Sequence, residues 1–253
     1  MSTIYQFLYE TTDVSRFAIR FFRDGLKPPY EIEEIIRQSY VIGYKSLPLV
    51  GITSFIMGLV LTIQSRPTLV EFGAESWLPS MVGISIIREI GPVITALICA
   101  GKIGSSIGAE LGSMKVTEQI DAMEVSGTNP FKFLVATRII ATTLMLPILA
   151  IMSDAIGIYG SYLAVNIKDT VSFPLFYNQV FTSLSFGDII PSVAKTFFFG
   201  FAIGLIGCYK GYHSDKGTQG VGRSANSAVV ISSLLVFIID LIAVQIADLF
   251  YEL

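Results

Sequence analysis

Long apolar stretches, separated by short polar connections, follow one another along most of the chain and determine its fold class. Five stretches carry few or no charges, and each provides the roughly 20 apolar residues that a helix needs to cross the ~30 Å hydrocarbon layer of a membrane. The pattern therefore predicts an all-α integral membrane protein with five transmembrane helices. The predicted helices cover residues 46–65, 78–101, 139–165, 192–209 and 227–247.

The composition supports a membrane protein and disfavours several other classes. Apolar residues make up 52% of the 253 residues and charged residues only 15%, whereas soluble domains carry about 25% charged residues. The net charge of −3 is too small to indicate a nucleic-acid partner. One histidine and two cysteines suggest no metal site, and no phosphate loop of the G-x-x-x-x-G-K-[ST] type occurs. We therefore expect a non-catalytic chain without a cofactor of its own.

The basic residues are distributed asymmetrically between the two sides of the predicted helices. Thirteen of the 17 Lys and Arg residues lie in the N-terminal segment and in the connections after the second and fourth helices. Five crossings place all three of these segments on one side, and an excess of basic residues marks the cytoplasmic side. The sequence thus predicts a cytoplasmic N-terminus and a C-terminus on the opposite side.

The N-terminal segment, residues 1–45, contains an amphipathic pattern over residues 4–27. Apolar side chains recur at helical spacing, and arginines follow a neighbouring stripe. Such a helix is typical of the membrane interface, with its apolar face in the acyl chains and its arginines on anionic lipid. A helix that docks on a protein partner is the alternative. The apolar positions are Phe7, Val14, Phe17, Ala18 and Phe21.

The connection after the second helix is predicted to contain a short amphipathic helix at about residues 116–126. Thr117 can cap its start, and Val116, Ile120 and Met123 form one apolar face. Gly127 is expected to end it. Because its other face is acidic and anionic headgroups would repel that face, we favour a protein partner over a lipid surface.

A series of short motifs runs from the second predicted helix into this connection. The motifs are Arg88-Glu89-Ile-Gly91-Pro92, Ala100-Gly101, Gly104-Ser105, Ala109-Glu110-Leu-Gly112 and Met114-Lys-Val-Thr-Glu-Gln-Ile-Asp-Ala-Met123. Together they closely resemble the MlaE-type permeases, and the likeness extends from about residue 45 to the C-terminus. The chain departs from the family pattern at Thr137, where proline is usual, and at Thr218-Gln219, where small residues are common.

The resemblance implies a function and a set of partners. MlaE-type permeases are membrane subunits of ABC transporters that move phospholipids between the inner and outer membranes of bacteria. Residues 46–253 would form the permease domain of a homodimer in the inner membrane, with a periplasmic C-terminus. Expected partners are a separate ATPase that binds ATP and Mg²⁺, an MCE-domain (MlaD-like) protein and a small STAS-type regulatory protein. The short acidic helix would be the coupling helix, and its expected ATPase contacts are Glu118, Gln119, Asp121 and Glu124.

Four ionisable residues fall at a similar depth inside the predicted helices, where charge is costly and usually functional. Arg88, Glu89, Lys195 and Asp240 could form buried ion pairs that lock helices together. Alternatively, Arg88 and Glu89 bind the headgroup of a phospholipid, with Arg88 on its phosphate. Asp154 is expected to serve packing. Apolar residues that would then line the acyl chains are Leu61, Leu69, Phe72 and Ile90.

Two other classes of function remain open at this point. In a proton-coupled secondary transporter, the carboxylates Glu89, Asp154 and Asp240 would carry protons. However, five spans do not divide into equal repeats, which such transporters usually show. In a structural scaffold the chain would only anchor partners. A copurifying ATPase would favour the ABC transporter.

Overall fold

The computed structural model describes residues 3–25, 27–28, 30–168 and 170–251, and side chains are described over residues 9–249 within these ranges. All regular secondary structure in the described residues is helical, and five helical stretches are long and apolar enough to cross a membrane, which confirms the predicted fold class. The side chain of Phe7 lies outside the described residues. The five candidate spans are Ile32–Glu71, Glu75–Val116, Phe131–Val165, Phe186–Tyr212 and Thr218–Leu249.

Each candidate span is longer than the stretch predicted from the sequence. The apolar pattern ends where charges appear, but backbone hydrogen bonds continue the helix past them. The second span shows this most clearly, because its helix continues beyond Gly101 and Lys102 to Val116. The connection that we expected to start at Gly101 therefore starts at Thr117.

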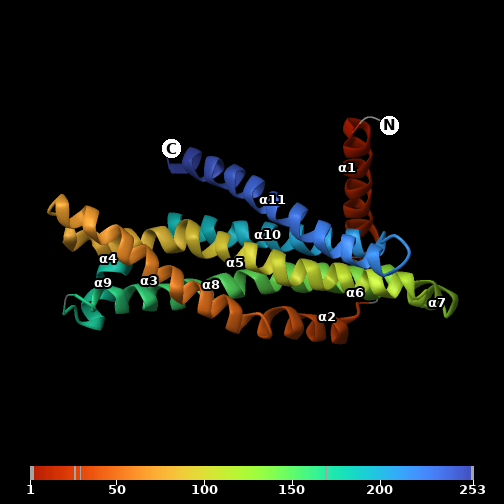
Figure 1. The fold of residues 1–253 in the computed structure, drawn as a ribbon, viewed down its shortest axis with the longest axis horizontal. Helices are drawn as coiled ribbons and strands as arrows, with labels where there is room; N and C mark the ends of the chain where they lie inside the picture. The colour runs from red at the N-terminus through yellow and green to blue at the C-terminus, as the bar shows by residue number, and fades with distance from the viewer. Residues whose placement is uncertain (1–2, 26, 29, 169, 252–253) are drawn as a thin grey trace. The chain divides into compact units, whose positions relative to one another are not determined.

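The helices bear the labels of Figure 1, and the short segments marked η are π-helical turns apart from the 3₁₀ turn η3. Several candidate spans are built from more than one segment, since π-turns interrupt the α-helical hydrogen bonding. The segments are α1 (Thr3–Arg20), η1 (Phe21–Gly25), α2 (Ile32–Ser39), η2 (Tyr40–Tyr44), α3 (Leu47–Glu71), η3 (Glu75–Trp77), α4 (Leu78–Ser85), η4 (Ile86–Ile90), α5 (Gly91–Cys99), η5 (Ala100–Gly104), α6 (Ser105–Val116), α7 (Gln119–Val125), η6 (Phe131–Ala136), α8 (Thr137–Val165), α9 (Phe173–Ser183), α10 (Phe186–Tyr212) and α11 (Thr218–Tyr251).

The chain packs as two compact units, each built from three segments of sequence. The first unit comprises Met1–Ile42, Cys99–Leu144 and Gly200–Leu235. The second unit comprises Gly43–Ile98, Met145–Phe199 and Val236–Leu253. The motif Arg88–Pro92 thus belongs to the second unit, and the acidic helix belongs to the first.

The first unit is held together by close contacts between its helices. Gly108 of α6 approaches α11 so closely that a Cβ atom there would lie 3.1 Å from the Cα of Ala225. The Ser224 hydroxyl donates a hydrogen bond of 3.1 Å to the Gly108 carbonyl at this contact. Gly104 and Gly112 also face α11, so the four-residue spacing of these glycines serves helix packing.

Helix α1 packs its aromatic face against other helices of the first unit. Phe17 and Phe21 are buried, and the Phe17 ring lies 5.1 Å from that of Phe131 and 5.6 Å from that of Tyr209. The Arg20 guanidinium lies over the Phe131 ring at 4.3 Å, a cation–π contact. These rings are therefore in contact with protein, whereas the sequence suggested acyl chains or a partner. Placement of this helix at the membrane interface stays a prediction.

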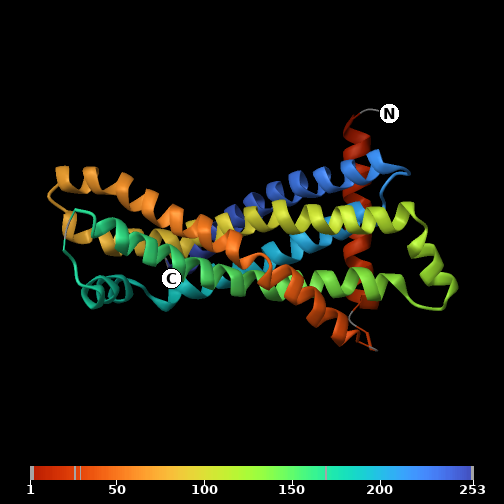
Figure 2. The ribbon, with the colours of Figure 1, turned by 60° about the horizontal axis from the view of Figure 1, so that its bottom comes forward.

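The second unit has an apolar core between α4, α8 and α9. Val82, Ile86, Ile158 and Phe176 are buried in it, and α9 packs directly on α4. Figures 1 and 2 both show α4 and α9 near one another. Pairs of hydrogen-bonded hydroxyl groups join α3 to α8. This unit carries the charged residues that the sequence places inside the spans.

Candidate substrate site and coupling helix

Arg88 and Glu89 lie on the π-turn η4, which interrupts the second span between α4 and α5. The turn closes with the Gly91 N–H bonded to the Ile86 carbonyl, five residues back. Pro92 follows and has no N–H to offer, so this stretch of backbone has fewer helical bonds than usual. A neighbouring helix compensates, because the Ser192 hydroxyl of α10 donates to the Ile87 carbonyl at 2.5 Å.

Lys195 of α10 joins three helices through its ammonium group. Its side chain is only 4% exposed, and Nζ donates to Glu89 Oε2 at 2.7 Å and to Asp240 Oδ1 of α11 at 2.8 Å. A lysine buried this deeply needs paired anions, since an isolated charge in an apolar medium is costly. The structure thus brings the buried charge cluster Glu89, Lys195 and Asp240 together.

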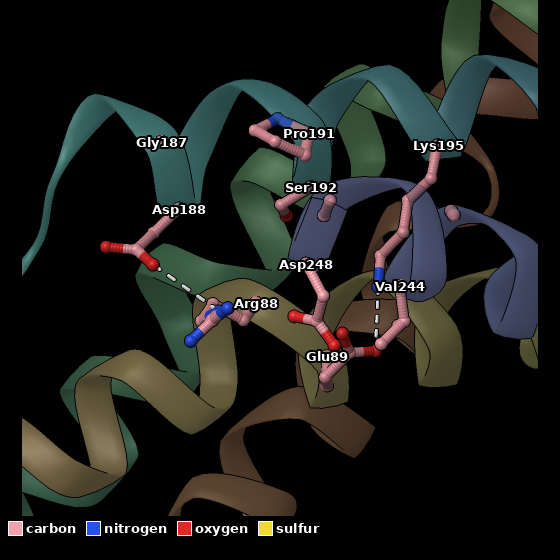
Figure 3. A pocket seen from close by; sticks show the side chains of 11 residues that line it. Arg88, Glu89, Gly187, Asp188, Pro191, Ser192, Lys195, Val244 and Asp248 are labelled. Atoms are coloured by element: carbon pink, nitrogen blue, oxygen red, sulfur yellow. Dashed lines mark hydrogen bonds and ion pairs between the residues drawn. The ribbon is translucent and has the colours of Figure 1, made fainter. Parts of the chain in front are cut away.

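Arg88 has a carboxylate partner on the first turn of α10. Its Nε lies 3.4 Å from Asp188 Oδ1, and the Asp188 side chain is 10% exposed (Figure 3). Asp188 also accepts hydrogen bonds of 2.8 Å from the N–H and the hydroxyl of Ser185, so it caps the start of α10. Arg88 and Glu89 are consecutive residues of η4, and both contact α10.

These side chains line a polar pocket that adjoins a larger apolar cavity within the second unit. The polar pocket has a volume of about 30 Å³, and Asp248 of α11 also contributes to it (Figure 3). The apolar cavity has a volume of about 330 Å³ and shares Gly187, Pro191, Lys195, Ala243 and Ala247 with the pocket. Its other lining residues are Ala194, Phe198 and Ile246.

The apolar residues that we expected to line acyl chains do not lie at this cavity, as far as the described side chains go. Leu61 and Leu69 pack against the core of the second unit. Ile90 lines a separate small cavity beside α3 and α8, and Phe72 is 78% exposed. Asp154 lies on α8 against the backbone of Gly91.

Sequence reasoning missed Asp188, Ser192 as a hydrogen-bond donor, and Asp248. Asp188 precedes the fourth predicted helix and Asp248 follows the fifth, so the boundaries drawn from hydropathy excluded both. A signal was present, because Asp188 and Lys195 are seven residues apart and therefore lie on the same face of a helix.

The expected coupling helix is α7, which crosses from the end of α6 to the start of the third span (Figure 2). Its start differs from the prediction. Thr117 ends α6, with its hydroxyl bonded to the Ser113 carbonyl at 2.9 Å, and Glu118 takes the position before α7. Glu118 has a left-handed backbone with φ of 59°, which is unusual for a residue other than glycine. Gly127, with φ of 82°, ends the helix as expected.

One face of α7 is buried and the opposite face is exposed. Ile120 is 1% exposed, whereas Glu118, Gln119, Asp121 and Glu124 are all exposed. Asp121 also accepts a hydrogen bond of 2.8 Å from Lys115 of α6. The helix therefore presents acidic side chains on a face that its own unit leaves open.

The fold and the site together define a class of protein. The chain is a multi-pass helical membrane protein with charged groups inside its spans, an apolar cavity beside them and an exposed acidic helix between two spans. Among the described residues, no group of three or more His, Cys, Asp and Glu side chains could hold a metal ion. These features are typical of the membrane subunit of a transporter.

Comparison with known proteins identifies the family. A model of the family described as Permease MlaE matches residues 35–246, so the chain belongs to the MlaE permease family and is a permease subunit of an ABC transporter. A probable ABC transporter permease protein of Rickettsia typhi is 43% identical over 213 residues, 84% of this chain and 82% of the relative. A probable ABC transporter permease protein of Synechocystis is 36% identical over 203 residues, 80% of this chain and 77% of the relative. The intermembrane phospholipid transport system permease protein MlaE of Haemophilus influenzae is 34% identical over 213 residues, 84% of this chain and 82% of the relative.

Membership of this family implies that the chain works with an ATPase. A permease of an ABC transporter does not itself hydrolyse ATP, and this sequence contains no phosphate loop. The ATPase is therefore a separate subunit.

Proposed function

We propose that this permease moves phospholipids between the inner and outer membranes of a bacterium, driven by ATP hydrolysis in its partner subunit. The observation that carries the proposal is the polar pocket next to an apolar cavity of about 330 Å³ in the second unit. A phospholipid needs this combination, because its headgroup is charged and its acyl chains are apolar. The name of the Haemophilus influenzae relative, which specifies phospholipid transport, supports the same substrate class.

The side chains of the pocket divide between headgroup binding and support. Arg88 is 39% exposed and provides the guanidinium that would bind a phosphate, for which its geometry is well suited. Glu89 lines the same pocket and would adjoin the headgroup, while Lys195 and Asp240 hold it in place. The acyl chains would lie along Phe198 and Ile246 in the apolar cavity.

The acidic face of α7 would transmit the action of the ATPase. Glu118, Gln119 and Glu124 are exposed there, and Asp121 adds a carboxylate fixed by Lys115. ATP and Mg²⁺ would bind to the ATPase and not to this chain. On this proposal the acidic helix and the N-terminus face the cytoplasm, and the C-terminus faces the periplasm.

Three further partners complete the proposed transporter. A second copy of the permease would form a homodimer, and an MCE-domain protein would receive or deliver lipid on the periplasmic side. A small STAS-type protein would regulate the ATPase. These assignments rest on family membership, and each can be tested by the composition of the purified complex.

The test is ATP-dependent lipid transfer by the purified complex. The permease is purified with its ATPase, reconstituted in vesicles of phosphatidylethanolamine and phosphatidylglycerol, and assayed with fluorescent phosphatidylethanolamine. We expect transfer to require ATP and Arg88→Met to reduce it about tenfold, the effect of losing one charge-assisted contact of about 1.4 kcal/mol.

The matched control is Arg66→Met, which removes an arginine that pairs with Glu75 at 2.7 Å outside the pocket. This variant should bind the ATPase and transfer lipid near the wild-type rate. Transfer that follows a proton gradient in the absence of nucleotide would refute the proposal in favour of a secondary transporter. Equal transfer by Arg88→Met and wild type would remove Arg88 from the headgroup site.

A further inference from the structure

Asp154 of α8 occupies the space that a side chain at Gly91 would need. A Cβ atom placed on Gly91 would collide with Asp154 Oδ1 and would lie 2.9 Å from its Cγ. The carboxyl group therefore fits against the bare Cα of Gly91, where a weak C–H···O contact can form. Within the described chain, Asp154 Oδ1 is a buried oxygen without a hydrogen-bond donor. Asp154 in this position therefore leaves room only for glycine at residue 91.

The contact lies where a π-turn and Pro92 reduce the backbone hydrogen bonding of the second span. Gly91 closes the π-turn η4 with its bond to the Ile86 carbonyl, and Pro92 removes the next backbone donor. A Cβ atom on Gly91 would also lie 3.0 Å from the Ile86 carbonyl oxygen. Because this backbone has fewer helical hydrogen bonds than usual, contacts with neighbouring helices help to determine its conformation. Ser192 of α10 holds it at the Ile87 carbonyl, and Asp154 contacts it at Gly91.

The π-turn determines where Arg88 and Glu89 point. Arg88 reaches Asp188 and Glu89 reaches Lys195, both on α10, from a turn that is widened by one residue. If the turn relaxed to a regular α-helix, the residues before Gly91 would rotate by about 100° relative to those after it. Whatever fixes this turn also fixes the two side chains of the pocket.

We propose that Asp154 is a positioning residue, which acts through Gly91 to hold the π-turn that directs Arg88 and Glu89 toward α10. Lys195 does not need Asp154 as a hydrogen-bonding partner, since it donates to Glu89 and Asp240. The carboxyl group acts by its shape and by its contact with Gly91. This inference rests on the proposed function of Arg88, so its experiment must separate the two.

The experiment measures phospholipid bound per permease in the complex purified with its ATPase. We expect Asp154→Ala to bind about threefold less phospholipid than the wild type, which corresponds to the typical free energy of one polar contact between membrane helices. Gly91→Ala should show a similar decrease. Asp154→Asn has the same shape and should retain lipid near the wild-type amount. In the double variant Gly91→Ala, Asp154→Ala, the new methyl group enters the vacated space and should restore part of the lipid, because its close approach of 3.0 Å to the Ile86 carbonyl oxygen remains.

The recovery in the double variant and in Asp154→Asn distinguishes positioning from a general loss of structure. The proposal is overturned if Asp154→Ala keeps its lipid, if Asp154→Asn loses as much as Asp154→Ala, or if the double variant is no better than the two single variants. Arg88→Met is measured in parallel. If Arg88→Met loses lipid and Asp154→Ala does not, positioning by Asp154 is refuted and the headgroup site stands. If Arg88→Met binds as much lipid as the wild type, the headgroup site is refuted, and so is the proposed role of Asp154 in positioning it.

Discussion

At the scale of single residues, Lys195 is the charge on which the site depends. It is 4% exposed and bonds two carboxylates that come from different helices, Glu89 and Asp240. Removing one partner of a buried ion cluster costs more than removing the whole cluster, because the remaining charges stay buried without compensation. The cluster is therefore more important for the stability of the second unit than any single contact suggests.

We expect Lys195→Met to lower the free energy of unfolding by about 2 kcal/mol, less than at a fully buried pair, since it leaves the Glu89 and Asp240 carboxylates, 44% and 19% exposed, facing one another without a cation. The measurement is the midpoint of thermal unfolding of the purified permease in detergent. The triple variant Lys195→Met, Glu89→Gln, Asp240→Asn removes all three charges and should recover most of the loss. A single variant as stable as the wild type would show that the cluster contributes no net stability.

The residues of the site could be predicted from the sequence only in part. Glu89, Lys195 and Asp240 stand out because charge is rare inside apolar helices. Asp188 and Asp248 do not, because they fall at helix ends where polar residues are ordinary. The apolar cavity is lined by α10 and α11, away from Leu61, Leu69, Phe72 and Ile90, whose contact with acyl chains stays a prediction. Its lining depends on the packing of distant segments.

At the scale of elements, the helix α7 combines a buried apolar side with an exposed acidic side. Ile120 fixes it to the first unit, and the hydrogen bond from Lys115 to Asp121 links it to α6. Glu118 and Glu124 are exposed and make no ion pair among the described residues. These two carboxylates are therefore the better targets for testing contact with the ATPase, because reversing Asp121 would also break its bond to Lys115.

We expect Glu118→Lys, Glu124→Lys to weaken binding of the ATPase on the order of tenfold or more, because like charges brought together at an interface are strongly unfavourable. Thermal unfolding of the permease should barely change, since both side chains are exposed and lysine meets the same backbone constraint at position 118 as glutamate. Copurification of the ATPase from detergent-solubilised membranes provides the measurement.

The matched control is Glu33→Lys, Glu71→Lys, which makes the same change of charge at exposed positions outside α7. It should leave copurification unchanged. Full ATPase binding by the α7 double variant would contradict the assignment of this helix as the coupling element.

The elements themselves could be predicted where local sequence determines them. Gly127 ends α7, and Asn129 accepts a hydrogen bond from the Lys132 N–H at the start of the next helix. The left-handed backbone at Glu118 and the π-turns could not be predicted, because neither has a local sequence requirement. A π-turn forms where neighbouring helices satisfy the displaced carbonyl groups, as Ser192 does for Ile87.

At the scale of the whole molecule, hydropathy and the distribution of basic residues predict different things. Hydropathy predicted five spans, and the structure confirms them. The basic residues predict which ends of the spans face the cytoplasm, and this orientation stays a prediction. Both cysteines, Cys99 and Cys208, are fully buried, so an introduced exposed cysteine can be labelled selectively.

We expect a membrane-impermeant maleimide to label Trp77→Cys and Ile167→Cys in intact spheroplasts, and Val125→Cys only after the membrane is permeabilised. These side chains are 69%, 67% and 90% exposed, so each is accessible from its own side. The wild-type protein, in which both thiols are buried, is the negative control for labelling. Labelling of Val125→Cys in sealed spheroplasts would place α7 outside and reverse the orientation.

Two pairs of hydroxyl groups join α3 to α8 at matching intervals. Ser54 bonds Ser153 at 2.5 Å and Thr62 bonds Ser161 at 2.6 Å, so both members of each pair advance by eight residues and the helices run parallel. Between them, Gly58 and Gly157 bring the two backbones into contact. Each bond joins residues 99 positions apart. During synthesis, α3 is therefore made long before α8, and the two helices can pair only after the second span and α7 have been made. Assembly of this permease must proceed by late docking of the third span.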